Sequence, residues 1–406
     1  MKADLDRLMV DRGLDAFVVL GGAEGNHVLK YMTNGASVTH TKVLKQRGEN
    51  PVLICEPMER EEAAKSGLPT LTTTEFDYPA LIRAAGSDFE AELRLLAAIF
   101  ERYSVRGTVC FYGMEDPGKA FMLLSRLGEA IPDIRVTGET ETTIFDEAYA
   151  TKSEQEMAFI KDVAERTNRA FSDVIEFIKQ HRVLDGRLVQ DEGAPLTVGR
   201  VKSFLRGRLM EFGLVDDGET IFAVGRDAGV PHSRGEDDDV LEIGKSIIFD
   251  LFPRSLKHGY YHDMTRTFCL GYAPPEVQRA YDQTLQAFNA VMDALQVGER
   301  ASLYQDIVCD VYEEHGHTTP RSHPGTVEGY VHSVGHGLGL QIHSRPRFRT
   351  NSDDLIAAGQ VFTVEPGLYY PSRGYGIRVE DTIYVDAEGQ IHSLTTFPKD
   401  LVLPIG

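Results

Sequence analysis

Two stretches of similar build decide the fold: residues 249–271, FDLFPRSLKHGYYHDMTRTFCLG, and residues 362–385, FTVEPGLYYPSRGYGIRVEDTIYV. In each stretch an apolar run ends in a carboxylate, a turn rich in proline or glycine follows, and a second strand-like run carries another carboxylate. Two helix-like segments precede each stretch. The repetition predicts a helix-helix-hairpin unit used twice around a pseudo-twofold axis, which would bring four carboxylates toward one centre.

The four helical patterns that belong to this repeat occupy residues 157–180, 196–213, 276–296 and 302–316. Ser153 and Glu156 form the S-x-x-E pattern of a capping box, which predicts the start of the first helix. We therefore expect an α+β domain over residues 150–406.

Residues 1–149 have a different pattern, in which strand-like and helix-like segments alternate. Strands are expected at 15–21, 52–55 and 107–113, and helices at 3–13, 58–67, 88–103 and 120–131. Such alternation predicts an α/β domain with a partly parallel sheet. The GGAEG at 21–25 has Leu20 where the first glycine of a dinucleotide loop should stand, so it is interpreted as a tight turn.

The composition of the 406 residues excludes several classes of protein. The apolar fraction of 42% is that of an ordinary globular chain. The 62 acidic against 42 basic residues give a net charge of -20, which would repel phosphate backbones and anionic lipids, so neither nucleic acid nor a membrane is expected as a partner. No apolar stretch reaches the roughly eighteen residues of a membrane span. The first residues lack the apolar run of a signal peptide, and the 4 cysteines form no CxxC, so a cytoplasmic protein is expected.

The first stretch carries a pair of aspartates. Asp250 closes an apolar run, where a carboxylate is costly unless it is paired or binds a metal. On the returning strand Asp263 shares a face with Thr265 and could face Asp250 across the hairpin. Two close carboxylates need a shared proton or cations, although two ordinary strand-end aspartates are the alternative.

The second cluster is HSVGHGLGLQIH at 332–343, with His332, His336 and His343. Its glycines argue against a helix, so the segment is expected to be backbone folded tightly against a neighbour. The third cluster holds Glu365, followed by Pro-Gly, and Arg378 with Glu380, which share one face of a predicted strand. Taken alone, the histidines could be structural and the Arg378–Glu380 side chains a plain buried ion pair.

Together the clusters supply an oxygen-rich donor set with one imidazole, which suits Mn, Co, Fe or Zn. Four carboxylates balance the charge of two divalent ions, as in two-metal hydrolases, where a water between the ions becomes the nucleophile.

These motifs resemble those of the M24 metallopeptidases, which have the pita-bread fold and include prolidase (Xaa-Pro dipeptidase) and aminopeptidase P. The resemblance covers residues 150–406 and rests on FDLFPR, GYYHDMTRTF, HSVGHGLGLQIH, FTVEPGLYY and GIRVEDT. Residues 1–149, with NHVLKYMTNG, are similar to the N-terminal domain of creatinase and prolidase.

The resemblance implies a role for each residue. Asp250 would chelate one ion, His336 and Glu365 the other, and Asp263 and Glu380 would bridge both. Glu365 would also act as acid and base in the reaction.

Further residues are implied on the substrate side. His332, His343 and His232 would lie near the substrate carbonyl, and Arg378 would support Glu380, with Tyr369 and Thr265 in similar roles.

Two positions depart from the family pattern. Phe252 stands where a glycine usually follows the first aspartate, in a turn that is slightly longer than usual. Ser344 replaces the acid that commonly follows His343.

The expected function is hydrolysis of Xaa-Pro bonds by a metal-bridging hydroxide, with manganese first among the metals and small proline-containing peptides as substrates. The resemblance also implies a homodimer. Dipeptidase and aminopeptidase P remain alternatives, as do a catalytically silent peptide-binding module and a side activity on organophosphorus esters. The complete ligand set argues against metal-free creatinase, and the extra domain argues against methionine aminopeptidase.

Overall fold

The computed structural model describes residues 4–113, 116–191, 193–217 and 220–405. The chain divides into two compact units, Met1–Ala148 and Tyr149–Gly406, so the boundary lies one residue before the position expected from the sequence. Among the described residues, no helix combines the length and the apolar character that crossing a membrane requires.

The first unit contains a six-stranded sheet in the order β4-β3-β2-β1-β5-β6. β1 runs parallel to β5, and β5 parallel to β6, while β2 is antiparallel to both of its neighbours. The partly parallel sheet predicted from the sequence is therefore present. Its strands are β1 (Ala16–Gly21), β2 (Thr41–Gln46), β3 (Val52–Cys55), β4 (Thr70–Thr72), β5 (Gly107–Gly113) and β6 (Ile134–Thr137).

Helices of the first unit connect these strands and pack on the sheet, with Leu95, Leu96 and Ile99 of α5 in its core. They are α1 (Leu5–Asp11), α2 (His27–Met32), α3 (Arg60–Ala64), α4 (Tyr78–Ala84), α5 (Asp88–Arg102), α6 (Pro117–Ala130) and α7 (Ile144–Ala150), within which the boundary falls.

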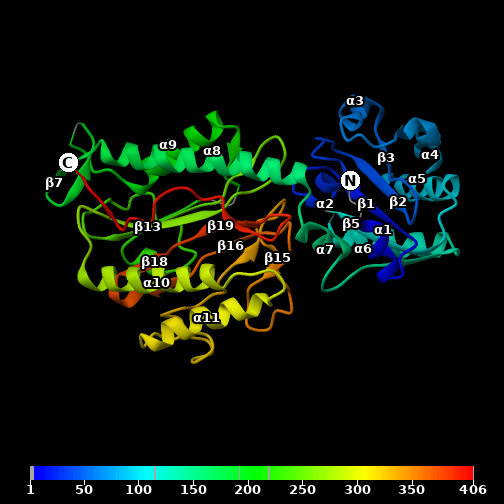
Figure 1. The fold of residues 1–406 in the computed structure, drawn as a ribbon. Coiled ribbons are helices and arrows are strands. Elements are labelled where there is room, and N and C mark those ends of the chain that lie inside the picture. The colour runs from blue at the N-terminus through cyan, green and yellow to red at the C-terminus, as the bar shows by residue number, and fades with distance from the viewer. Residues whose placement is uncertain (1–3, 114–115, 192, 218–219, 406) are drawn as a thin grey trace. The chain divides into compact units, whose positions relative to one another are not determined.

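In the second unit two helix pairs enclose the strands (Figure 1). α8 (Glu154–Lys179) and α9 (Val198–Glu211) pack on one set of strands, and α10 (Pro275–Ala294) and α11 (Ala301–Glu314) pack on the other. All four helices begin and end within three residues of their predicted limits. The capping box at Ser153 and Glu156 is formed and starts α8.

Each helix pair precedes an antiparallel strand pair, as the repeat predicts. After α8 and α9, β11 (Ser246–Leu251) pairs with β13 (Met264–Leu270) in a sheet of order β10-β11-β13-β21. After α10 and α11, β16 (Val361–Val364) pairs with β19 (Asp381–Val385) in a sheet of order β15-β14-β16-β19-β20. The prediction of an α+β domain built from repeated helix-helix-hairpin units is confirmed.

Short strands complete the second unit. They are β7 (Arg182–Leu184), β8 (Arg187–Val189), β9 (Leu214–Val215), β10 (Ile221–Val224), β12 (Arg254–Ser255), β14 (His336–Gly337), β15 (Ser344–Arg347), β17 (Gly367–Tyr370), β18 (Tyr375–Arg378), β20 (Ile391–Ser393) and β21 (Val402–Leu403).

The two strand sets meet through backbone and side-chain bonds around β13. The Glu380 amide donates to Thr265 O at 3.0 Å, and the Arg378 amide donates to Thr267 Oγ1 at 2.8 Å. Since Asp250 lies directly opposite Thr265 across β11 and β13, this junction brings the carboxylates of both repeats into one place.

Candidate metal centre

Five predicted ligands reach one cavity of about 350 Å³ from different strands. Asp250 lies near the end of β11, and Asp263 immediately precedes β13. The other three are His336 on β14, Glu365 directly after β16, and Glu380 between β18 and β19. The expected facing pair is slightly offset, because the cross-strand partner of Asp250 is Thr265 rather than Asp263.

Close backbone approach explains the glycines around His336. A Cβ on Gly335 would lie 2.1 Å from Thr363 O, and one on Gly337 would lie 1.9 Å from Arg345 O. Only glycine lets the segment approach its neighbours this closely. As expected, the segment is not helical, and His336 is held in the short strand β14.

Ligand atoms of Asp263, His336 and Glu380 all lie within 4.8 Å of one another. His336 Nε2 is 3.7 Å from Asp263 Oδ2 and 3.3 Å from Glu365 Oε1. Imidazole and carboxylate donors at this spacing fit a borderline divalent cation.

Buried oxygens without partners support that fit. Asp250 Oδ1, Asp263 Oδ1 and Glu380 Oε1 have no hydrogen-bond partner among the described residues. The three side chains belong to residues that are only 8%, 4% and 1% exposed. Buried polar atoms are normally paired, so orphaned carboxylate oxygens converging on one place are best explained by cations.

The electrostatics point in the same direction. Burial, together with the negative charges of Asp250 and Glu365, raises the pKa of Asp263 well above its usual value. Burial raises the pKa of Glu365 to about 8, although Arg378 opposes the shift. Burial and Asp263 likewise raise the pKa of Glu380. These acids cannot all ionise together at neutral pH without positive charge between them.

Burial also lowers the pKa of His336 to about 3, with His343 contributing. The imidazole is therefore neutral at physiological pH, which is the form that binds metals.

Arg378 holds one side of the cavity through four bonds. Its guanidinium donates to Asp250 Oδ2 at 2.5 Å, Tyr369 Oη at 2.9 Å, Thr265 Oγ1 at 3.2 Å and Pro231 O at 3.3 Å. The sequence expectation paired Arg378 with Glu380. The structure instead pairs it with Asp250, while Glu380 Oε2 accepts a bond from Thr265 Oγ1 at 2.7 Å.

The three predicted substrate-side histidines differ in their surroundings. His332 contacts Ser333 O through Nδ1 at 2.7 Å and Tyr369 Oη through Nε2 at 2.8 Å, so both ring nitrogens have partners. Burial lowers its pKa to about 4. His232 and His343 line the same cavity and are exposed.

Apolar side chains also line the cavity, and sequence patterns missed most of them. Ile221 lies opposite Asp250 because β10 pairs with β11, and Ile342 precedes His343. β10 is four residues long, so no period in the sequence marks it. Phe252 was visible only as a departure from the family pattern, and it too faces the cavity.

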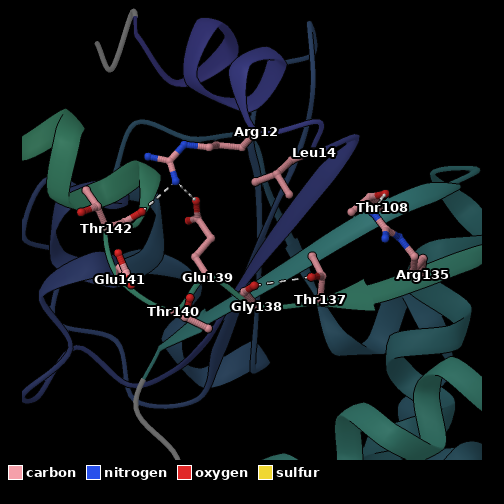
Figure 2. Close-up of a pocket in the computed structure, with 10 residues that line it drawn as sticks. All are labelled: Arg12, Leu14, Thr108, Arg135, Thr137, Gly138, Glu139, Thr140, Glu141 and Thr142. Carbon is pink, nitrogen blue, oxygen red and sulfur yellow. Dashed lines mark hydrogen bonds and ion pairs between the residues drawn. The ribbon is translucent and has the colours of Figure 1, made fainter.

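A second cavity, of about 360 Å³, lies in the first unit (Figure 2). Its charged groups engage one another: Arg12 points toward Glu139 at 3.3 Å and donates to Thr142 O at 2.9 Å. Arg135 donates to Thr108 Oγ1 at 3.1 Å. This cavity offers no convergent set of metal donors among the described residues.

Comparisons with known proteins agree with this geometry. Residues 158–387 match the model of metallopeptidase family M24. A putative dipeptidase, YkvY, of Bacillus subtilis is 32% identical over 184 residues, 45% of this chain and 47% of that protein. The Xaa-Pro dipeptidase of Pyrococcus furiosus is 33% identical over 172 residues, 42% of this chain and 45% of that protein. The matched segment thus spans about half the length of these curated relatives.

Among solved structures, the Xaa-Pro dipeptidase from Bacillus anthracis has a TM-score of 0.78 at 23% identity and covers 99% of both chains. The X-Pro aminopeptidase from Thermotoga maritima has a TM-score of 0.74 at 22% identity, with 96% of this chain and 98% of that chain covered. At this level of sequence identity, the structural similarity shows the fold alone. With the family match over more than half its length, the chain belongs to metallopeptidase family M24 and has its pita-bread fold.

Proposed function

We propose that this chain is a dinuclear metal-dependent peptidase that hydrolyses Xaa-Pro bonds in small peptides. The observation that carries the proposal is the convergence of five donor residues on one cavity, where three of them, Asp250, Asp263 and Glu380, each have a buried carboxylate oxygen without a partner among the described residues. In this proposal Asp250 would hold one ion, His336 and Glu365 would hold the other, and Asp263 and Glu380 would serve both. Manganese is proposed first, with cobalt, zinc and iron as alternatives.

Bound divalent ions would polarise the scissile carbonyl and make water a nucleophile near neutral pH. The chain's own groups move the protons. Glu365, which bound cations would keep ionised, could accept the proton of the attacking water and return it to the leaving nitrogen. That donation matters for a Xaa-Pro bond, because the proline nitrogen carries no hydrogen before cleavage.

Exposed imidazoles at the cavity can assist. His232 and His343 line the cavity, and in this proposal they would donate hydrogen bonds to the oxygen that becomes negative in the transition state. In the present arrangement His332 orients Tyr369 instead, since both of its nitrogens are engaged.

The decisive experiment measures cleavage of an Ala-Pro dipeptide and an Ala-Pro-Ala tripeptide by protein stripped of metal and then reloaded. We expect no activity without metal and recovery with Mn, Co, Zn or Fe, while an Ala-Ala dipeptide serves as the control for proline selectivity. The two proline peptides separate dipeptidase from aminopeptidase. If none of the four metals restores cleavage of the dipeptide or of the tripeptide, the proposal is overturned.

Asp263→Asn provides a matched test of the donor set. We expect the variant to fold, to bind fewer than two metal equivalents by elemental analysis, and to lose about a thousandfold in kcat/KM, since metal stabilisation of the transition state amounts to several kcal/mol. Two full equivalents in this variant would contradict the bridging role of Asp263.

A further inference from the structure

The cavity that holds the proposed ligands has a lining that is partly apolar. Its apolar part comes from Ile221, Pro231, Phe252 and Ile342, and the remainder from the carboxylates, the histidines, Ser333 and Arg378. Phe252 is the unusual member, because a glycine usually stands there in the M24 metallopeptidases. It follows Asp250 by two residues at the start of the turn toward Asp263.

The turn that carries Phe252 is anchored on two sides. Arg254–Ser255 (β12) pairs with Leu214–Val215 (β9). Farther along, Tyr260 Oη donates to Glu156 Oε1 of α8 at 2.8 Å, and the His258 ring stacks on Phe159 with centroids 3.8 Å apart and planes at 12°. Phe252 therefore stands at the base of a hairpin that these contacts hold in place.

The same hairpin also contacts the segment that carries Ile342. The Tyr261 amide donates to Gly339 O at 2.9 Å, on the loop that leads to Ile342. Tyr261 and Ile342 pack with Leu338 and Tyr260 in one apolar cluster. The two segments that bring Phe252 and Ile342 to the cavity are thus packed against each other.

A peptide with a free amino terminus enters such a cavity in a preferred direction. Its ammonium group is attracted to the carboxylates, among which Asp250 lies next to Phe252. The side chain of the amino-terminal residue then lies against the apolar side. A volume of about 350 Å³ is near the lower end of ligand cavities, so little room remains there.

We propose that Phe252 limits the size of the residue before the scissile bond, selecting a small apolar side chain such as alanine over leucine or phenylalanine. The proposal rests on the proposed Xaa-Pro peptidase function and names its substrate class. A large side chain meets the ring of Phe252, and a charged one loses its hydration without gaining a partner on the apolar wall.

The test compares kcat/KM for Ala-Pro, Leu-Pro and Phe-Pro dipeptides with manganese-loaded wild type, Phe252→Ala, Phe252→Leu and Leu256→Ala. Wild type should favour Ala-Pro over Leu-Pro by about tenfold or more, the scale of discrimination by apolar pockets. Phe252→Ala should reduce the ratio of kcat/KM for Ala-Pro to kcat/KM for Leu-Pro about tenfold, and Phe252→Leu should reduce this ratio less. Leu256, on the same hairpin and 52% exposed outside the cavity, provides the control, whose ratio should match wild type.

A wild-type enzyme without preference for Ala-Pro, or equal ratios in wild type and both Phe252 variants, would overturn the role of Phe252 and leave the peptidase function standing. If the wild type cleaves none of the peptides with any metal, the peptidase function fails. Calorimetric Kd values of the same peptides for wild type and Phe252→Ala then decide the role of Phe252. If the ratio of the Kd for Leu-Pro to the Kd for Ala-Pro differs between wild type and Phe252→Ala, that role is supported. If the ratio is the same in both proteins, the role is overturned.

Discussion

At the scale of single residues, Tyr369 links two groups of the site through one hydroxyl. The hydroxyl accepts a hydrogen bond from Arg378 Nη1 at 2.9 Å and donates to His332 Nε2 at 2.8 Å. Tyr369 is fully buried, so neither partner can exchange this bond for water. Since Ser333 O can only accept, His332 carries its proton on Nδ1, and the Tyr369 hydroxyl orients both the His332 ring and the guanidinium that holds Asp250.

Tyr369→Phe should lower kcat by about 10- to 100-fold, the usual effect of removing a group that orients a metal ligand. It should also lower the free energy of unfolding by about 1–3 kcal/mol, because two buried groups lose a partner. Urea unfolding of the metal-free protein and steady-state kinetics measure the two effects.

Tyr281→Phe is the matched control, since Tyr281 is also buried and donates to Lys399 O at 2.8 Å, outside the cavity. It should lose stability without loss of kcat. Equal effects of both variants on kcat would remove Tyr369 from the site.

At the scale of elements, the sequence predicted the segments that carry ligands and missed strands in which charged residues interrupt the apolar pattern. Carboxylates interrupting apolar runs identify Asp250 and Glu365 directly. β2 escaped because Lys42 and Lys45 break its apolar pattern. Both are buried, and their ammonium groups pair with Glu92 at 2.9 Å and with Asp6 at 2.5 Å.

The register of the β11–β13 strand pair could not be predicted from the sequence either. The hairpin between Asp250 and Asp263 places Thr265, not Asp263, opposite Asp250, because the turn includes its own strand, β12, which pairs with β9. Strand alternation alone identifies a shared face but not the residue across it.

The start of α8 offers a prediction at this scale, because Glu156 serves two elements. Its Oε2 accepts a hydrogen bond from the Ser153 amide at 2.9 Å. Its Oε1 accepts one at 2.8 Å from Tyr260 Oη, in the hairpin between Asp250 and Asp263. Ser153→Ala should cost about 1 kcal/mol of stability, as loss of an N-cap does. Glu156→Ala should cost about 1 kcal/mol more, because the Tyr260 bond is lost as well.

Denaturant unfolding of both variants and of Tyr260→Phe measures this coupling. Equal destabilisation by Ser153→Ala and Glu156→Ala would show that the bond to the hairpin contributes nothing.

At the scale of the whole molecule, the net charge of -20 is mostly surface, but the buried groups control how stability depends on pH. Burial lowers the pKa of His332 and His317 to about 4, and of His262 and His336 to about 3. Their folded-state pKa values lie below the unfolded value of about 6.5, so below that pH the unfolded chain takes up protons first. These histidines therefore make stability fall as pH drops from 6.5 toward 4.

The buried acids of the metal centre change stability with pH in the opposite direction. The pKa of Glu365 rises from an ordinary value of 4.5 to about 8 in the folded protein, so its contribution to stability is present at low pH and is lost as pH rises through 8. Asp263 and Glu380 shift in the same direction. Above pH 6.5 the histidines no longer compensate, and the metal-free protein should become less stable.

Between pH 6.5 and 8 we expect the metal-free protein to lose about 1.5 kcal/mol of unfolding free energy through Glu365 alone, at about 1.4 kcal/mol per proton and pH unit. Urea unfolding in a chelator measures the fall, and Glu365→Gln should reduce it by that amount. Saturation with manganese should abolish the fall, because cations between the carboxylates favour their ionised forms. Equal stability of the metal-free protein at both pH values would mean that the pKa of Glu365 is not raised in the folded protein, and the electrostatic argument for a metal centre would fail.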